Sequence, residues 1–284
     1  MNEPAFINAL KSLARDPAAR GLVDDAAVLG DLVLTHDMIV EGVHFLPDDP
    51  AGDVAWKLVA VNLSDLAAKG AEPVGCLLGY TLGPDDWNAA FIAGLRDVLE
   101  AYSLPLLGGD TVRANGPRSF GLTAIGRASL APSRTGARAG DALYVTGTIG
   151  RAGIGLKLLQ AGKTGPEVGA YRRPRPRLAE GRALAPLVHA MMDVSDGLLI
   201  DAKRMAEASG LAVAIDLDTV PVSGDPLAAA TAGDDYELLF AAPPDLALPV
   251  PAVRIGTFSE GEGLTLTVHG APLALPERLG WLHT

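Results

Sequence analysis

Six aspartates combine a residue type and a placement that suit chemistry. Each lies where an apolar strand or helix meets a loop, or stands where the surrounding helix disfavours an acid. The positions are Asp25, Asp37, Asp65, Asp110, Asp193 and Asp196. Because no Cys or His pair stands at zinc spacing, the ion that these carboxylates would bind is hard and octahedral, Mg²⁺ or Mn²⁺.

A glycine-rich turn beside one of these acids favours phosphate chemistry. The adjacent glycines of Gly108-Gly109-Asp110-Thr111 let backbone amides approach a phosphate closely, although the same pattern also makes ordinary turns. Gly162-Lys163-Thr164 fails the full P-loop pattern, and the chain has no Gly-x-Ser-x-Gly or dinucleotide fingerprint. Many carboxylates with glycine-rich turns therefore predict phosphoryl transfer through charge neutralisation and positioning.

The stretch from Thr35 to Phe45 offers donors at both of its ends. Residues 32–34 predict a buried strand, after which Thr35-His36-Asp37 supplies oxygen and nitrogen donors and His44 supplies an imidazole. Strand ends of this kind commonly bind ligands. The alternative is a polar loop that only caps the strand.

Asp65 and Asp193 are the acids that ordinary secondary structure explains least. Asp65 lies near the C-terminal end of a predicted helix, where the helix dipole disfavours an anion, and an exposed residue without a role is the alternative. Ser195 or Asp196 can serve as the N-cap of the helix that follows, but Asp193 lies too early for that.

The composition limits the partners. The 284-residue chain has a formal net charge of −11, which argues against nucleic acid and against an anionic membrane surface. A phosphate-containing partner of so acidic a chain needs a cation, usually Mg²⁺, between the two. Cys76 is the single cysteine, so no internal disulfide is expected. No secretory segment opens the chain and no apolar run approaches the ~20 residues of a membrane span, so we expect a cytoplasmic protein.

Apolar periodicity predicts the elements that must position these residues. In the first half it predicts helices over 4–20, 54–69 and 84–102, and strands near 28 and over 32–34, 104–107 and 119–128. Asp53 is a suitable N-cap and Gly70 a suitable stop for the second of these helices. In the second half it predicts strands over 142–146, 212–217, 238–241, 254–258 and 264–268, with helices ending near 159 and 209.

Residues 129–141 form the best linker, because Ser, Pro, Arg, Gly and Asp dominate them. We therefore expect two domains, 1–130 and 137–284, with Arg134 between them near a possible nucleotide. The arginine cluster of residues 172–177 suits either an anion-facing surface or a solvated helix start. Trp281 suits either docking on the core or stacking on a heteroaromatic ligand.

An ordered set of motifs, spread over nearly the whole chain, resembles the thiamine-monophosphate kinase family. The first motifs are Val23-Asp24-Asp25-Ala26-Ala27, Thr35-His36-Asp37 through Val43-His44-Phe45, and Asn62-Leu63-Ser64-Asp65-Leu66-Ala67-Ala68. The later ones are Gly108-Gly109-Asp110-Thr111, Arg175-Pro176-Arg177, Asp193-Val194-Ser195-Asp196-Gly197-Leu198 and Asp234-Asp235-Tyr236-Glu237-Leu238. Each motif is weak alone, but the set in the family's order is highly specific.

The resemblance implies a PurM-like α+β fold of two α/β domains, with mixed or antiparallel sheets packed against helices. It also implies a homodimer joined through the N-terminal domains, and ATP-dependent phosphorylation of thiamine monophosphate to thiamine diphosphate with several Mg²⁺ ions. The acceptor is itself a phosphate that is largely dianionic at neutral pH, so it needs no general base. Our hypothesis is direct in-line transfer with Mg²⁺ bridging the donor and acceptor phosphates.

The resemblance also assigns roles to individual residues. The metal ligands it implies are Asp25, Thr35, His36, Asp37, Asp65, Asp110, Asp193 and Asp196. The ATP contacts it implies are Tyr102, Gly109, Asp110, Arg134 and Ser195, and the thiamine phosphate contacts are His44, Asp234 and Trp281.

Four places depart from the family's pattern. Val23 stands where Gly is usual, His36 where a second Thr or Ser is usual, and Asp234 where Glu is usual; Leu282-His283-Thr284 matches the family's ending only in part.

Related enzymes are the nearest alternatives. The chain has no cysteine near its N-terminus, which disfavours selenophosphate synthetase. It has none at its C-terminus, which disfavours the hydrogenase-maturation relative. An aminoimidazole-ribonucleotide synthetase-like enzyme and a non-catalytic nucleotide- or thiamine-phosphate-binding protein remain.

Overall fold

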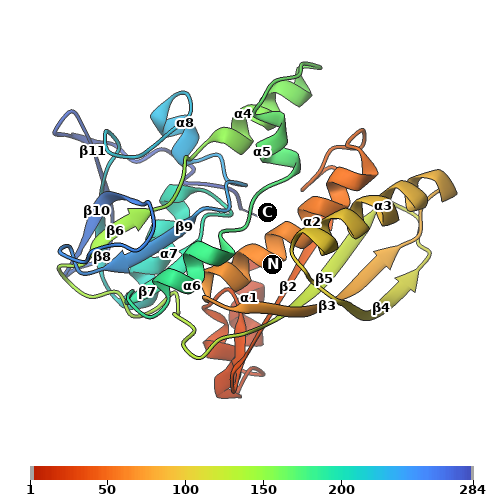
Figure 1. Cartoon of the computed structure of the whole chain (residues 1–284). Helices are drawn as coiled ribbons and strands as arrows, with labels where there is room; N and C mark the ends of the chain where they lie inside the picture. The colour runs from red at the N-terminus through yellow and green to blue at the C-terminus, as the bar shows by residue number, and fades with distance from the viewer. Residues whose placement is uncertain (1–2, 283–284) are drawn as a thin grey trace.

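Two mixed β-sheets, each packed against helices, build the computed structural model, which describes residues 3–282 (Figure 1). The first sheet has the strand order β1-β2-β5-β3-β4 and is antiparallel except where β3 and β4 run parallel. Its strands are β1 (Ala27–Leu29), β2 (Leu32–Val40), β3 (Glu72–Thr81), β4 (Leu106–Val112) and β5 (Ser119–Arg127). The helices α2 (Ala51–Ala68) and α3 (Asp85–Ala101) cover one face of it.

The core of this half forms because alternate residues of each strand point at those helices. Val33 and Ile39 of β2 and Phe120 of β5 are buried in one cluster with Leu58 of α2. Among the described residues no helix covers the opposite face of the sheet (Figure 1), and Met38 is 54% exposed there. The first sheet therefore has one packed face and one open face.

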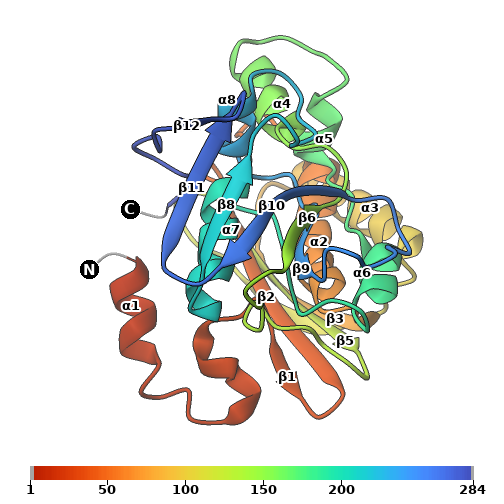
Figure 2. The same ribbon diagram turned by 90° about the vertical axis from the view of Figure 1, so that its left-hand side faces the viewer.

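The second sheet has the strand order β12-β11-β8-β10-β6-β9-β7 and is antiparallel except where β8 and β11 run parallel (Figure 2). Its strands are β6 (Ala142–Val145), β7 (Ala190–Asp193), β8 (Ala212–Asp216), β9 (Leu238–Ala242), β10 (Val253–Ser259), β11 (Gly263–Val268) and β12 (Ala271–Leu273). The helices of this half are α4 (Arg151–Gln160), α5 (Val168–Arg172), α6 (Leu178–Leu184), α7 (Leu198–Ser209) and α8 (Pro226–Ala230). Leu198, Leu199 and Met205 of α7 pack into the core of this sheet.

The helix α2 joins the two halves. One side of it packs on β2, β5 and α3, and the other side contacts α6 and β7. Ala67 and Ala68, at its C-terminal end, are buried in a cluster with Leu184, Met191 and Phe240 of the second half. Because both sides of α2 are covered, its last turns lie where the two sheets meet.

Several predicted features are wrong. The helix predicted over 4–20 ends at Leu10 as α1 (Glu3–Leu10), and a 3₁₀ segment (Pro17–Leu22) follows, because Pro17 cannot continue a helix and Asp16 caps the new turn. Pro50, not Asp53, is the N-cap of α2, and Asp53 lies in the first turn of the helix. The polar loop predicted from Thr35 is strand, because β2 pairs with β5 along its whole length.

The turn predicted at Gly108-Gly109-Asp110-Thr111 is wrong as well, because these residues lie within β4, which pairs with β3. The elements β3, β12, α5 and α8 were not predicted, and most of the others agree with the sequence-based expectations. The helix predicted over 84–102 is α3, and Gly210 ends α7 in a left-handed conformation with φ of 68°. Gly70, with φ of 60°, follows the C-cap of α2 in the same way. His283 and Thr284, which end the partly matching C-terminal motif, lie outside the described residues. Within residues 3–282, no helix combines the length and apolar character that crossing a lipid bilayer requires.

Candidate active site

The strand β2 presents Thr35 and His36 to opposite sides of the first sheet. Thr35 faces α2, where its Oγ1 donates a hydrogen bond to the Asp65 carboxylate. His36 lies on the open face, where its Nδ1 is 2.9 Å from Thr123 Oγ1. The pleat of the strand therefore separates His36 from its neighbours Thr35 and Asp37, which share the packed face.

The last turns of α2 carry the polar residues that reach both halves. Asn62 Oδ1 accepts a hydrogen bond from the Asp37 backbone N–H at 3.0 Å, which fixes β2 against the helix. Ser64 Oγ donates to Asp193 Oδ2 at 2.5 Å, which ties the helix to the end of β7. Asn62 and Ser64 therefore hold Asp37 of the first sheet and Asp193 of the second sheet close to Asp65 of the same helix.

Three carboxylates from separate segments converge at this point. Asp25, Asp65 and Asp193 each place a carboxylate oxygen so that all three lie within 4.8 Å of one another. Asp65 and Asp193 are buried, and the Asp25 side chain is 3% exposed. Three buried acids at this spacing match the donor set of a hard divalent cation.

Burial and mutual repulsion raise the pKa values of Asp37, Asp65 and Asp193. Burial, together with the neighbouring carboxylates, raises the pKa of Asp37 to about 6 and of Asp193 to about 8, and raises that of Asp65 well above its ordinary value. Among residues 3–282, no Lys or Arg forms an ion pair with Asp37, Asp65 or Asp193. A bound divalent cation would relieve this repulsion, so the donor set fits Mg²⁺.

Asp24 and Asp25 have the opposite environment, because three cations surround them. Asp24 pairs with Arg20 and Lys69, each at 2.5 Å, and Asp25 pairs with Lys69 and Arg134. Burial opposes ionisation of both acids, but these cations hold the pKa of each below its ordinary value. Arg20 and Lys69 were not expected from the sequence, since nothing in their local patterns indicates a distant acid.

Two atoms in this group lack a hydrogen-bond partner. Asp25 Oδ2 is buried and lies 2.7 Å from Lys69 Nζ without accepting a hydrogen bond of good geometry. Arg134 Nε is buried as well and donates to nothing within the described residues. Buried polar atoms without partners are rare, so each marks a place where a ligand would be favourable.

A cleft of about 1090 Å³ opens from these acids between the two halves of the chain. Sequence-predicted site residues that line it are Asp25, Asp37, His44, Asp65, Arg134, Asp193, Ser195, Asp196, Asp234 and Trp281. The structure thus brings together ten residues from both sheets, the linker and the C-terminal segment.

The turn that carries Ser195 and Asp196 is organised by residues that the sequence did not single out. The buried Asp201 carboxylate accepts hydrogen bonds from the backbone N–H groups of residues 195–197, at 3.1 to 3.2 Å. Arg204 pairs with Asp196 at 2.5 Å and with Asp201 at 2.9 Å. Asp201 follows Asp193 and Asp196 within a few residues, and this density of acids was the sequence signal that could have indicated its role.

His44, Asp234 and Trp281 also line the cleft, and the Asp234 backbone N–H donates to the Ser195 carbonyl at 2.7 Å. His44 Nδ1 accepts a hydrogen bond from the Val40 backbone N–H at 3.0 Å, so the neutral ring carries its proton on Nε2. Asp234 has a left-handed φ of 62°, and Lys57 Nζ, itself buried, donates to its Oδ2 at 2.9 Å. Trp281 is 51% exposed, and its backbone N–H donates to the Asp196 carbonyl at 2.8 Å.

Four predicted site residues lie away from the acids in the single chain. His36 is on the open face, as described above, and Tyr102 packs edge-on against Trp56 with ring centroids 5.9 Å apart. Gly109 and Asp110 lie in β4, the exposed edge strand, three strands from β2. At the usual strand spacing that is about 14 Å across the sheet.

The arginines of residues 172–177 pair largely with acids of the protein itself. Arg172 pairs with Asp49 at 2.7 Å, and Arg177 pairs with Glu237. Arg175 is exposed and only approaches Glu180, at 3.9 Å. The cluster therefore fastens the segment around α5 and α6 rather than presenting a row of unpaired cations.

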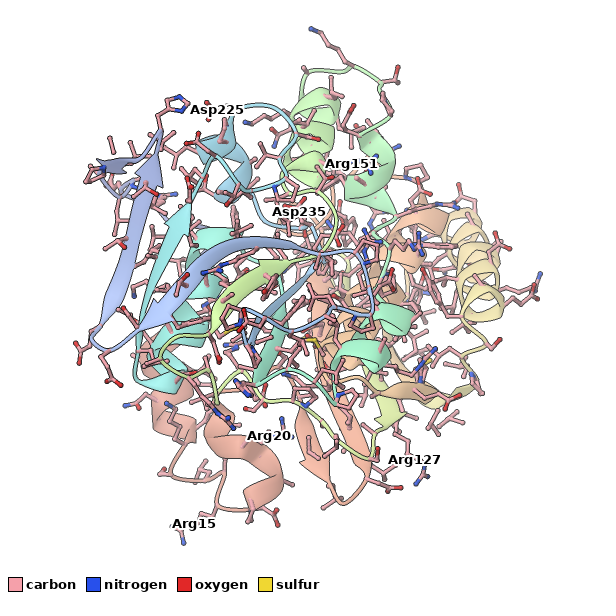
Figure 3. The ribbon with its side chains drawn as sticks, turned by 60° about the vertical axis from the view of Figure 1, so that its left-hand side comes forward. Arg15, Arg20, Arg127, Arg151, Asp225 and Asp235 are labelled. Atoms are coloured by element: carbon pink, nitrogen blue, oxygen red, sulfur yellow. The ribbon has the colours of Figure 1, made fainter. Side chains whose placement is uncertain are left out.

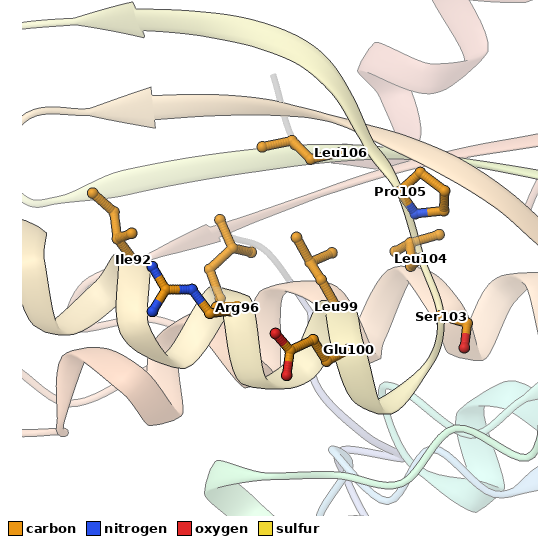
Figure 4. A pocket seen from close by; sticks show the side chains of 9 residues that line it. Ile92, Arg96, Leu99, Glu100, Ser103, Leu104, Pro105 and Leu106 are labelled. Carbon is orange, nitrogen blue, oxygen red and sulfur yellow. The ribbon is translucent and has the colours of Figure 1, made fainter.

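Other features lie outside the acidic centre. The carboxyl of Asp235 accepts a hydrogen bond from the Gly150 backbone N–H at 2.8 Å, near Arg151 in Figure 3, and burial raises its pKa to about 7. A smaller apolar cavity of about 410 Å³ lies between α3 and the segment that enters β4 (Figure 4). Ile92 and Leu99 line it, and none of the predicted site residues does.

Two sequence families match this chain. The family described as AIR synthase related protein, N-terminal domain, matches residues 23–128, and its C-terminal counterpart matches residues 138–277. The chain is 40% identical over 312 residues to the thiamine-monophosphate kinase of Caulobacter vibrioides, covering 96% of this chain and 88% of that protein.

Solved structures match over the full length. The structure described as AaThiL complexed with AMPPCP and TMP has a TM-score of 0.90 and 29% identity, covering 100% of this chain and 97% of that one. The thiamine-monophosphate kinase of Stenotrophomonas maltophilia K279a has a TM-score of 0.77 and 37% identity, covering 94% of this chain and 95% of that one.

Proposed function

The chain belongs to the thiamine-monophosphate kinase family, and on that basis we propose that it transfers a phosphoryl group from ATP to thiamine monophosphate, giving thiamine diphosphate and ADP. The PurM-like two-domain fold that the resemblance implied is confirmed by the match to the family and to its solved structures. One observation carries the proposal most directly. The cleft between the sheets is lined by the acids of the family motifs, in a fold like that of a relative bound to an ATP analogue and TMP.

The acidic centre is the part of the cleft suited to Mg²⁺. The proposed ligands are Asp25, Thr35, Asp37, Asp65, Asp193 and Asp196. The convergence of three carboxylates and the raised pKa values of Asp37 and Asp193 support a cation there. When bound, Mg²⁺ neutralises the repulsion between donor and acceptor phosphates.

Arg134 and Ser195 suit the phosphates of ATP. The buried Arg134 Nε has no hydrogen-bond partner in the described residues, and Arg134 lines the cleft beside the acids. A guanidinium with a spare donor suits a phosphate oxygen, since Arg commonly binds phosphate through two N–H groups. Asp201 accepts hydrogen bonds from the backbone around Ser195, which fixes the turn that carries Ser195 in the lining of the cleft.

His44, Asp234 and Trp281 of the same cleft suit thiamine monophosphate. With Nδ1 accepting the Val40 N–H, the neutral His44 ring has its donor on Nε2. Lys57 fixes the Asp234 carboxylate, and the half-exposed Trp281 offers a ring face for stacking.

Phosphoryl transfer would then be direct. The phosphate of thiamine monophosphate is already a nucleophile at neutral pH, so no residue needs to remove a proton from it. The enzyme's contribution is to hold the two phosphates in line and exclude water. A chiral γ-phosphorus should therefore invert; retention would point to a phosphorylated enzyme instead.

The proposal includes a homodimer that places β4 of one protomer at the partner's cleft. All residues of β4 are exposed, and β1 pairs with β2 only over residues 32–34, so no described strand lies beside residues 35–40 on the β1 side, where side chains accept from the Asp37 and Val40 N–H groups. Adding a partner's β4 along that edge would bring a second copy's Gly109 and Asp110 beside Asp37. Such pairing removes two exposed strand edges at once, which otherwise favour aggregation.

An ADP-release assay with ATP, Mg²⁺ and thiamine monophosphate tests the proposed activity. We expect release that depends on all three, and loss of it in Asp37→Asn. No turnover by the unchanged protein with thiamine monophosphate would refute the proposal, and wild-type activity in Asp37→Asn would refute the metal assignment.

A further inference from the structure

Lys69 is a buried cation inside the acidic centre. It follows the last residue of α2 and has no exposed surface. Its Nζ donates to Asp24 Oδ1 at 2.5 Å and to the Met191 carbonyl at 3.1 Å, and lies 2.7 Å from Asp25 Oδ2. A buried ammonium is costly unless several partners surround it, and this one has partners from both halves of the chain.

The position of Lys69 divides the acids into two groups. Asp24 and Asp25 face Lys69, Arg20 and Arg134, so their charges are already compensated. Asp37, Asp65 and Asp193 form no ion pair with any described Lys or Arg, whereas Asp196 pairs with Arg204. Asp25 belongs to both groups, because it also shares the carboxylate triad with Asp65 and Asp193.

We propose that Lys69 is a positioning residue whose ammonium acts as a permanent cation of the metal site. It occupies the side of the centre next to Asp24, and its charge opposes a divalent ion bound by Asp25, Asp65 and Asp193, while Arg134 also pairs with Asp25. The inference rests on the proposed metal-assisted reaction and deepens it. A helix-capping role alone does not account for Lys69, since its Nζ bonds go to Asp24 and to Met191 rather than to the helix carbonyls.

A fixed positive charge beside Asp25 lowers the affinity of the centre for Mg²⁺, because the ammonium and the metal repel each other. Replacing Lys69 by the uncharged and similarly long Met removes this repulsion and leaves Asp24 with Arg20 as its cation. Lys69→Met should therefore bind Mg²⁺ more tightly, by about tenfold or more. Its metal-free form should also melt at a lower temperature, with Mg²⁺ restoring most of the loss.

The measurement is calorimetric titration with MgCl₂ alone, without nucleotide, alongside thermal melts in EDTA and in Mg²⁺. Lys69→Arg keeps the charge and should stay within about threefold of the unchanged protein. Lys163→Met, at an exposed lysine, is the matched control and should change neither reading. Unchanged or weaker Mg²⁺ binding by a folded Lys69→Met protein would overturn the proposal.

Asp24→Asn keeps the test decisive if Lys69→Met does not fold. With Asp24 neutral, the charges of Lys69 and Arg20 bear more strongly on the centre, so Mg²⁺ affinity should fall by about threefold or more. An affinity equal to or above that of the unchanged protein would overturn the proposal in this arm.

The readings separate this inference from the proposed function. Normal ADP release together with unchanged Mg²⁺ affinity in Lys69→Met contradicts the role of Lys69 alone. Mg²⁺ binding that follows the predicted pattern without ADP release contradicts the proposed kinase activity alone. If neither protein binds Mg²⁺, the inference falls together with the metal site.

Discussion

Replacing Asp193 by Asn should make the metal-free protein more stable and the enzyme inactive. Asp193 is buried at the end of β7, and Ser64 Oγ donates a hydrogen bond to its Oδ2. Asn offers a carbonyl oxygen of the same shape to accept that bond. What it lacks is the negative charge, which burial and Asp25 make unfavourable in the metal-free fold.

The size of the effect follows from the pKa. Burial raises the pKa of Asp193 from 3.8 to about 8. A raised pKa gives stability that is complete below the unfolded value and is lost progressively as pH rises from the unfolded toward the folded value, so at pH 7 about 4 kcal/mol is already lost. Because neighbouring acids share this cost, we expect Asn to recover about half of it, ~2 kcal/mol. In a chain of this size that raises Tm by about 4–8 °C.

Thermal melts in EDTA at pH 7, repeated with excess Mg²⁺, measure the effect. In EDTA the variant should melt above the unchanged protein, and Mg²⁺ should raise the Tm of the variant less than that of the unchanged protein. In the ADP-release assay the variant should lose at least about a hundredfold in kcat/KM, since a lost ligand weakens the metal itself.

A lower metal-free Tm in Asp193→Asn would refute the reasoning, because it would show that the charge stabilises the fold. The conservative control is Asp193→Glu. It keeps the charge, so it should gain no stability in EDTA.

Three further predictions concern residues outside the lining of the cleft. Burial raises the pKa of Asp235 from 3.8 to about 7, so the stability that the protonated group contributes is lost as pH rises toward 7. Asp235→Asn should therefore flatten the fall in Tm between pH 5 and pH 8, which thermal melts across that range measure. If Asp110 serves the partner's cleft, Asp110→Ala and Asp193→Asn should each be inactive. When the two variants are mixed and exchange subunits, half of the dimers are heterodimers with one intact site of two, so ADP release should recover to about a quarter of the wild-type value. No recovery despite dimer exchange would contradict that arrangement. Lys57→Met should raise KM for thiamine monophosphate by about tenfold with a smaller change in kcat, because Asp234 loses its ion-pair partner at 2.9 Å; an unchanged KM would contradict the role given to Asp234.

Local sequence patterns were sufficient for most of the fold. The apolar stripe of α3 and the glycines that end α2 and α7 act within a few residues, so their effects can be recognised without tertiary contacts. The helix predicted through residue 20 failed at Pro17, which is also a local signal but was outweighed by the periodicity around it.

The strand β2 shows how a local signal can be present and still be missed. Thr35 to Val40 alternate between the two faces of the sheet, as a strand requires, but their polar side chains resemble a loop. With the strand recognised, period-two alternation alone places His36 on the face opposite Thr35 and Asp37. Grouping His36 with the other candidate ligands therefore ignored geometry that the sequence already contained.

The charge arrangement around Asp25 could not have been predicted in the same way. Lys69 lies 45 positions from Asp24 and Arg134 lies 109 from Asp25, and each is brought to its acid only because α2 and the linker meet at the junction of the sheets. A lysine at the end of an apolar helix normally extends to water. Here Gly70 turns the chain away directly after it, and the second half covers it, with the Met191 carbonyl accepting a hydrogen bond. The same burial that hides Lys69 from sequence patterns is what makes its charge count strongly at the metal site, since little water remains to screen it.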